Sequence, residues 1–130
     1  MNIKPYTTKL FHEGEDLSAF IASTIKKIPE ASVLVVASKI VALSERRTVF
    51  PYTEDTFLKL VKRESVWAIP TMKTWLTEKD GMMMQSAGLD ESNGSGKLVL
   101  LPVDSYKSAE VLRRKLMKHY GVKKLGVVIS

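Results

Sequence analysis

Residues 32–42, SVLVVASKIVA, form the most hydrophobic stretch of this chain and decide its fold. The first half of the stretch shows no alternation of apolar and polar residues, which is typical of a β-strand covered on both faces. Ser38 and Lys39 end the apolar run, and α/β proteins place ligand-binding groups at the carboxyl ends of strands. Two interpretations of this pair stay open, a phosphate-binding group and a solvated strand end.

Patterns on both sides of this strand predict further elements. Before it, residues 3–11 alternate loosely and predict a short strand, and apolar residues at helical spacing predict a helix that begins near Glu15 and ends at Pro29. After it, the patterns predict a helix that is capped by Thr53 and has Phe57, Leu60, Val61 and Ala68 facing inward. A hairpin of residues 71–78 and 82–87 and a strand over residues 97–101 are predicted next. The last predicted elements are a helix capped by Ser105 and ended by Gly121, and a strand over residues 124–130.

The order of these elements indicates the fold class. The predicted order β-α-β-α-β-hairpin-loop-β-α-β, without repeats or low-complexity linkers, is typical of an α/β protein with a mixed α+β sheet. Asp80-Gly81 marks the hairpin turn, because this dipeptide favours tight reversed turns. A length of 130 residues suits one domain. The sequence therefore predicts a single α/β domain over residues 1–130.

Composition and charge exclude several classes of protein. The chain contains no cysteine, which excludes disulfide scaffolds, thiolate zinc sites and cysteine nucleophiles. It shows no secretion signal and no run long enough to span a membrane, so a cytoplasmic protein without membrane contact is expected. The formal net charge of +6 favours anionic partners such as phosphates and nucleotides, although an ordinary basic surface explains it equally simply.

The segment of residues 88–96, GLDESNGSG, has the composition of a metal- or phosphate-binding loop. Its carboxylates and hydroxyls offer hard oxygen ligands to Mg²⁺ or Mn²⁺, and its glycines let a ligand approach the backbone. The same residue types also form ordinary turns. Asp90 has no basic neighbour in the sequence, so its carboxylate is expected to stand without a structural partner.

The predicted helix over residues 105–120 is strongly basic, with one acidic residue, Glu110. Such a face suits either a polyanion or solvent. No aromatic interleaving or zinc pattern accompanies it, so binding to nucleic acid is not expected. The basic residues are Lys107, Arg113, Arg114, Lys115 and Lys118.

Three motifs occur in order along the chain: VLVVASKIVALSERR at residues 33–47, AGLDESN at residues 87–93, and the Leu-Leu-Pro that ends at Pro102. Together they closely resemble the GTP-dependent gamma-glutamyl ligase family of coenzyme F420 biosynthesis. The resemblance implies an enzyme that uses GTP with Mg²⁺ or Mn²⁺ to phosphorylate a carboxylate of a phospholactyl deazaflavin. The amine of L-glutamate then displaces the phosphate. It also implies an anionic small-molecule substrate and a homodimer.

The resemblance implies roles for individual residues of this sequence, but it assigns no catalytic residue. Asp90 resembles a metal ligand of the family, and Asn93 resembles a nucleotide contact beside it. Ser38 and Lys39 resemble further nucleotide contacts at the strand end. The residues in place of the family's first nucleotide-contacting turn are Thr8, Lys9, Leu10 and Phe11.

The sequence also departs from the family's usual pattern. A Gly-Ile-Pro or Gly-Leu-Pro turn is frequent where this chain has residues 7–10, TTKL, and Ala-Asn is frequent where it has Gln85-Ser86. Leu43 stands in place of a frequent lysine, and Arg46 in place of a usual glycine.

Length is the largest departure from the family. The family's chain continues past the strand at residues 126–130 into an Asp-Thr pair, whose aspartate is another metal ligand, and then into a long segment. This chain is therefore expected to be an amino-terminal portion that does not catalyse the whole reaction alone. Two alternatives stay open, a nucleotide- or metal-binding module without turnover and a basic nucleic-acid-binding or assembly domain.

Overall fold

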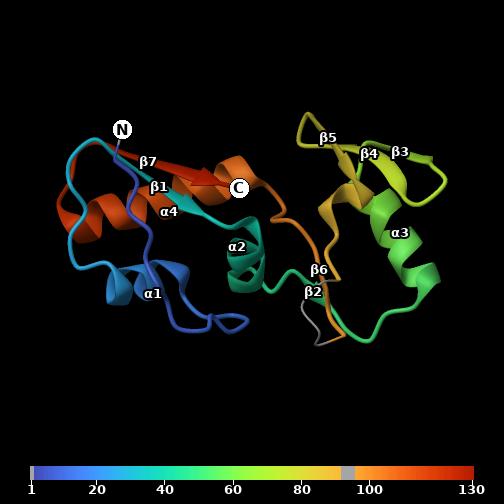
Figure 1. Ribbon diagram of the computed structural model, residues 1–130, viewed down its shortest axis with the longest axis horizontal. Helices are drawn as coiled ribbons and strands as arrows, with labels where there is room; N and C mark the ends of the chain where they lie inside the picture. Colours follow the sequence, from blue (N-terminus) through green and yellow to red (C-terminus); the bar gives the residue numbers. More distant parts are fainter. Residues whose placement is uncertain (1, 92–95) are drawn as a thin grey trace.

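The computed structural model describes residues 2–91 and 96–130, and it confirms a mixed α/β fold (Figure 1). In this part of the chain, the strands form three small sheets. None of the helices in the described ranges is both long enough and apolar enough to cross a membrane. The elements are α1 (Leu17–Thr24), β1 (Ser32–Val36), α2 (Ser38–Ser44), β2 (Thr48–Val49), α3 (Glu54–Glu64), β3 (Trp67–Pro70), β4 (Trp75–Lys79), β5 (Met82–Gln85), the 3₁₀ turn η1 (Ser86–Gly88), β6 (Leu98–Val99), α4 (Ser105–Tyr120) and β7 (Leu125–Ile129).

The first lobe consists of α1, β1, α2, α4 and β7. The two strands pair in parallel, from Ser32 opposite Leu125 to Val36 opposite Ile129. One face of this pair packs against α1 and α4, and Leu112 and Leu116 of α4 lie buried in the resulting core. The carboxyl ends of both strands therefore meet next to the beginning of α2 (Figure 1).

The second lobe consists of α3 and the antiparallel sheet β3-β4-β5. Its smaller hydrophobic cluster contains the buried residues Leu60, Leu98 and Leu100. The antiparallel pair of β2 and β6 lies between the two lobes (Figure 1). Residues of either lobe can therefore contribute to a site beside the β2–β6 pair.

Local sequence signals account for several element boundaries. The side chain of Thr53 accepts a hydrogen bond from the backbone N–H of Thr56 and caps α3, as predicted. Asp80 and Gly81 both have positive φ angles, 54° and 73°, so the predicted reversed turn joins β4 to β5. Gly121, with φ 67°, ends α4 as expected.

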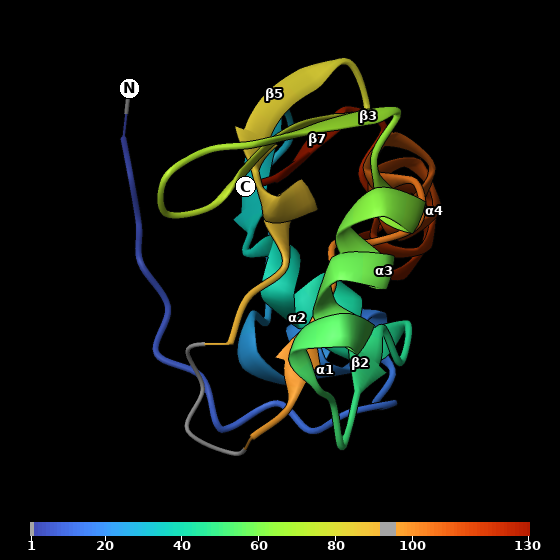
Figure 2. The ribbon, with the colours of Figure 1, turned by 90° about the vertical axis from the view of Figure 1, so that its right-hand side faces the viewer.

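The amino-terminal segment corrects the first prediction. Residues 2–16 contain no strand; the segment runs along one side of the molecule and turns at residues 13–14 (Figure 2). A strand needs a partner for its backbone groups, and β1 and β7 pair only with each other in the described chain. Phe11 fixes the segment instead, because it is 5% exposed and its ring meets that of Phe20 edge to face at 4.9 Å.

The decisive stretch of residues 32–42 is also not a single strand. The strand ends at Val36, and α2 begins at Ser38. A continuous apolar run is compatible with either structure, so its period cannot distinguish them. Val41 and Ala42 are buried on the inner side of the helix. The predicted order therefore gains α2, as well as the short strands β2 and β3, and loses its first strand.

Two further boundaries differ from the predictions. The cap of α4 is Asp104, whose carboxylate accepts a hydrogen bond from the N–H of Lys107 at 2.8 Å, and not Ser105. Ala68 lies in β3 rather than on α3, because α3 ends at Glu64 and the following chain turns to pair with β4. The apolar Ala68 lies at helical spacing from Val61, and this spacing wrongly predicts that the helix continues.

Candidate functional site

The junction between the lobes brings Lys39 against Asp90. Lys39 Nζ lies 2.5 Å from Asp90 Oδ2, and the two side chains are 28% and 37% exposed. The expectation that Asp90 stands without a partner is therefore wrong. Its cation comes from a distant part of the sequence, so inspection of neighbouring residues could not reveal it. Two residues that were predicted separately, one for a nucleotide and one for a metal, are in direct contact.

The ends of the parallel strands position Lys39. The backbone N–H of Ser38 donates to the carbonyl of Ser130 at 2.7 Å, and the N–H of Ser130 donates to the carbonyl of Val36 at 3.0 Å. These bonds fasten the beginning of α2 to the end of β7. Ser38 and Lys39 thus lie at the carboxyl ends of a parallel strand pair, where ligand-binding groups were expected.

A strained turn positions Asp90. Ser86, Ala87 and Gly88 have consecutive positive φ angles of 47°, 53° and 70°. Non-glycine residues in this region cost on the order of 1–3 kcal/mol each, and surrounding contacts must hold them there. After the turn, Asp90 and Val99 exchange two backbone hydrogen bonds of 2.9 Å. The carboxylate therefore sits on a segment with a fixed direction.

Buried hydroxyl groups hold the strained turn in place. Thr77 is 0% exposed, and its hydroxyl donates to the carbonyl of Met84 at 2.7 Å and accepts from the N–H of Ala87 at 2.8 Å. The hydroxyls of Thr74 and Ser86 lie 2.9 Å apart. The sequence reasoning missed these residues. The available signal was the family's frequent Asn at the position of Ser86, since Asn tolerates a positive φ.

The amino-terminal segment reaches the same region through Glu13. Its carboxylate accepts a 2.8 Å hydrogen bond from Lys97 Nζ and another from the hydroxyl of Thr48. These two bonds, and then the nearby charges, hold the pKa of Glu13 below its ordinary value. The segment just before α1 is thereby tied to Lys97 and to Thr48 of β2.

The predicted turn at residues 8–11 is only partly available to a ligand. Thr8, Lys9 and Leu10 are exposed, whereas Phe11 is buried in the core. Asn93 lies outside the described residues. The assignment of these positions to a nucleotide stays a prediction.

The described donors fit a divalent cation only in part. Carboxylate oxygens such as those of Asp90 suit Mg²⁺ or Mn²⁺. In residues 2–91 and 96–130, however, no group of three or more acidic or histidine side chains is arranged to hold a metal ion. A cation at Asp90 would need additional ligands and would compete with Lys39.

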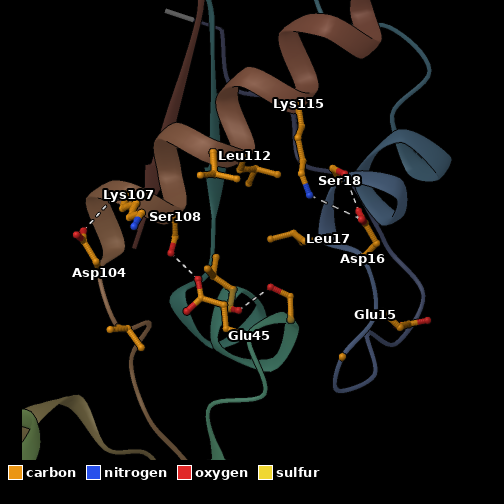
Figure 3. Close-up of a pocket in the computed structure, with 15 residues that line it drawn as sticks. Glu15, Asp16, Leu17, Ser18, Glu45, Asp104, Lys107, Ser108, Leu112 and Lys115 are labelled. Atoms are coloured by element: carbon orange, nitrogen blue, oxygen red, sulfur yellow. Dashed lines mark hydrogen bonds and ion pairs between the residues drawn. The ribbon is translucent and has the colours of Figure 1, made fainter.

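A crevice of about 720 Å³ lies elsewhere in the first lobe (Figure 3). It is formed by the beginnings of α1 and α4 and the end of α2. Its polar groups bind one another: Asp16 accepts from Ser18 at 2.6 Å and from the N–H of Ala19 at 2.8 Å, and Ser108 donates to Glu45 (Figure 3). The crevice contains none of the predicted site residues.

The basic helix α4 carries partly neutralised charges. Glu110 binds Arg113 at 2.8 Å and Arg114 at 2.7 Å. Hydrogen bonds from Arg113 and then Arg114 lower the pKa of Glu110 to about 2. This pairing reduces the charge that the helix could offer to a polyanion.

We therefore expect weak binding to double-stranded DNA and RNA, with a Kd of about 1 µM or higher at physiological salt, as for non-specific binding. Fluorescence anisotropy at several salt concentrations measures this. Submicromolar binding that is lost in an Arg113→Gln, Arg114→Gln, Lys118→Gln variant would show that α4 reads nucleic acid after all.

Comparison with known proteins points to one family. The family model described as F420-0:Gamma-glutamyl ligase matches residues 6–130. A protein named coenzyme F420:L-glutamate ligase from Archaeoglobus fulgidus is 32% identical over 139 residues, which cover 93% of this chain and 55% of that protein. The protein of the same name from Methanopyrus kandleri is 29% identical over 138 residues, covering 90% of this chain and 53% of that protein. The chain thus spans about half the length of these curated relatives.

Proposed function

Because the chain belongs to the F420-0:gamma-glutamyl ligase family, we propose that it contributes the nucleotide- and metal-binding side of a GTP-dependent ligase. The reaction would join L-glutamate to a carboxylate of a phospholactyl deazaflavin, or a related acid to an amino acid. The observation that carries the proposal is the contact between Lys39 and Asp90 at the junction of the lobes.

The proposed chemistry needs charge more than it needs covalent participation by the protein. A substrate carboxylate oxygen attacks the γ-phosphorus of GTP, and GDP leaves. The amine of L-glutamate then attacks the acyl carbon and loses a proton, and inorganic phosphate leaves. Both steps pass through crowded negative charge, which cations must neutralise. A bound Mg²⁺ or Mn²⁺ would supply part of that charge.

Lys39 is suited to bind a phosphate oxygen of the nucleotide. Its ammonium lies at the carboxyl ends of β1 and β7 and is already held toward an anionic oxygen, that of Asp90. A phosphate that took the place of this carboxylate would form a charge-assisted hydrogen bond of the same kind. Asp90 would then be available to a divalent cation. Binding of the nucleotide to Lys39 would therefore release the Asp90 carboxylate from Lys39, so that the carboxylate could bind the cation.

Replacing Lys39 with glutamine is expected to change two affinities in opposite directions. GTP binding without Mg²⁺ should weaken about tenfold, because a charge-assisted bond to phosphate is lost. Mn²⁺ binding without nucleotide should strengthen, because a competing cation has left Asp90. Isothermal titration calorimetry measures both, with Lys27→Gln on the exposed surface as the control. GTP affinity equal to that of the parent would remove Lys39 from the proposed site.

A further inference from the structure

The two lobes have separate hydrophobic clusters. The cluster of the first lobe contains Leu112 and Leu116 of α4, and the cluster of the second lobe contains Leu60 of α3. No described residue belongs to both clusters. Units that are not joined by a large hydrophobic interface are expected to move relative to each other. The contacts that keep the lobes in one orientation are therefore expected among the polar residues at the junction.

Arg47 follows α2 and forms hydrogen bonds with parts of both lobes. In the first lobe, its backbone N–H donates to the carbonyl of Ala42 at 2.9 Å. In the second lobe, its guanidinium Nη2 lies 2.5 Å from Glu64 Oε2, at the end of α3. Its Nε donates to the carbonyl of Leu101 at 3.0 Å, and its own carbonyl accepts from the N–H of Leu100 at 2.9 Å. Arg47 thus connects α2, α3 and the segment that follows β6.

The ion pair of Arg47 and Glu64 is shielded from solvent. The two side chains are 17% and 10% exposed, compared with 28% and 37% for Lys39 and Asp90. Salt screens a shielded pair less than an exposed one, and separating a buried pair leaves charges without partners, which is strongly unfavourable. A guanidinium is also favoured at the carboxyl end of a helix such as α3, where the helix dipole is negative. Of these two contacts, the pair of Arg47 and Glu64 is therefore the more resistant to separation.

Cations from two further residues hold Glu64 in place. Lys79 Nζ of β4 lies 3.4 Å from Glu64 Oε2, and Arg63 Nη2 lies 2.8 Å from Glu64 Oε1. Burial raises the pKa of Glu64, but the hydrogen bond from Arg63 and the charges of Arg47 and Lys79 outweigh this effect and hold its pKa below the ordinary value. The carboxylate therefore stays charged at neutral pH and is fixed within the second lobe, where it offers Arg47 a rigid acceptor.

The contacts of Arg47 lead to both members of the candidate site. Leu101, whose carbonyl accepts from Arg47, packs directly on Gly88, since a Cβ at Gly88 would lie 2.5 Å from Leu101 Cδ1. Gly88 ends the strained turn that precedes Asp90. On the other side, the backbone of Arg47 binds α2, the helix that carries Lys39 in its first turn. The position of Arg47 therefore affects the placement of both side chains.

We propose that Arg47 is a positioning residue that fixes the two lobes in the orientation in which Lys39 meets Asp90. Arginine suits this role because its planar guanidinium presents several N–H donors in fixed directions, so that one side chain binds Glu64 and Leu101 at the same time. The fixed orientation of the lobes stands on the structure alone. Its effect on nucleotide binding rests on the proposed function, so the two are measured separately.

The orientation of the lobes can be measured without any ligand. The chain contains no cysteine, so Lys59→Cys on α3 and Lys118→Cys on α4 introduce two specific sites for nitroxide labels. Both positions are exposed, and they lie in different lobes. Double electron–electron resonance between the labels gives the distribution of distances between the lobes. We expect one narrow distribution in the labelled parent and a broad one in Arg47→Gln, because the ion pair that holds the lobes is lost.

Arg63→Gln is the matched control. Arg63 also binds Glu64, but both residues belong to α3, and Arg63 is 61% exposed. Loss of this bond should leave the distance distribution of the parent unchanged. Arg47→Lys keeps the charge but has no planar fork to bind both acceptors, so its distribution should lie between those of the parent and Arg47→Gln. Circular dichroism confirms folding, and this milder variant keeps the test valid if Arg47→Gln does not fold.

Nucleotide affinity provides the second measurement. Isothermal titration calorimetry should show that Mg²⁺-dependent GTP binding weakens about tenfold in Arg47→Gln, because a hydrogen bond to a charged group is lost when Lys39 and Asp90 are no longer held together. Arg63→Gln should bind GTP as tightly as the parent. A residue that serves stability alone would lower the Tm but leave the distance distribution and the affinity per folded molecule unchanged.

The two measurements separate the inference from the proposed function. Equal distance distributions in the parent, Arg47→Gln and Arg47→Lys would overturn the inference, as would broadening in Arg63→Gln as large as that in Arg47→Gln. Weaker GTP binding in Arg47→Gln with the distance distribution of the parent would also overturn it, because Arg47 would then act on the nucleotide in another way. A broad distribution in Arg47→Gln with unchanged GTP affinity would support the role of Arg47 in fixing the lobes while contradicting the proposed function.

Discussion

Replacing Asp90 with asparagine should weaken Mg²⁺-dependent GTP binding by about 100-fold. Asparagine keeps an oxygen in place but removes the negative charge that compensates a divalent cation for its lost water. Substitution of a residue that only hydrogen-bonds a metal ligand typically weakens metal affinity about 10–100-fold. The loss of a direct ligand is therefore expected to weaken it by the upper end of that range. GTP binding without Mg²⁺ should change far less. Calorimetric titration with and without Mg²⁺ measures the difference.

The stability of the Asp90→Asn variant distinguishes a ligand from a structural residue. The lost ion pair with Lys39 is partly exposed on both sides, so its removal should cost only about 0–1 kcal/mol of unfolding free energy. Glu91→Gln, a neighbouring change on the opposite side of the segment, is the matched control and should leave Mg²⁺-dependent binding intact. A large fall in Tm with unchanged GTP affinity per folded molecule would mean that Asp90 serves the fold alone.

Replacing Gly88 with alanine should destabilise the protein by about 3 kcal/mol or more. Its φ angle of 70° is strained for a residue with a side chain. A Cβ there would also lie 2.5 Å from Leu101 Cδ1 and 2.7 Å from Leu101 Cγ, so the Leu101 side chain would have to shift. Strain of about 1–2 kcal/mol adds to a clash of about 1–3 kcal/mol. Urea denaturation measures the sum.

Gly81 supplies the control for this variant. It has a similar φ of 73°, but a Cβ there meets no atom within 4 Å. Gly81→Ala should therefore show the strain alone, about 1–2 kcal/mol. The difference between the two variants isolates the close approach at Gly88. Equal stabilities of Gly88→Ala and Gly81→Ala would contradict the tight packing that we infer beside Asp90.

Local signals predicted some elements correctly because the residues concerned determine their own backbone. Asp80-Gly81 adopts the reversed turn in any surroundings that allow it, and Gly121 ends α4 through its own positive φ. The strand expected at residues 3–11 failed because a strand depends on a partner, and the described chain offers none to it. The run at residues 32–42 was divided between strand and helix by packing that periodicity does not encode.

The candidate site was predictable in its parts but not in its assembly. The motifs indicated Ser38, Lys39 and Asp90 separately, each from its residue type and position. The contact between Lys39 and Asp90 requires both lobes to be in place, and no local pattern carries that information. Arg46 illustrates what the family pattern could have added: it stands where the family usually has glycine, and its φ is 55°, a value that favours glycine.

The central claim is that a divalent cation and the nucleotide meet at Asp90. The most direct test is electron paramagnetic resonance of Mn²⁺ during a GTP titration of the natural polypeptide that carries these residues. We predict that protein lowers the free Mn²⁺ signal further than GTP alone does, and that Asp90→Asn removes most of this additional fall whereas Glu91→Gln does not. Mn²⁺ binding with GTP that is as tight in Asp90→Asn as in the parent would contradict the account.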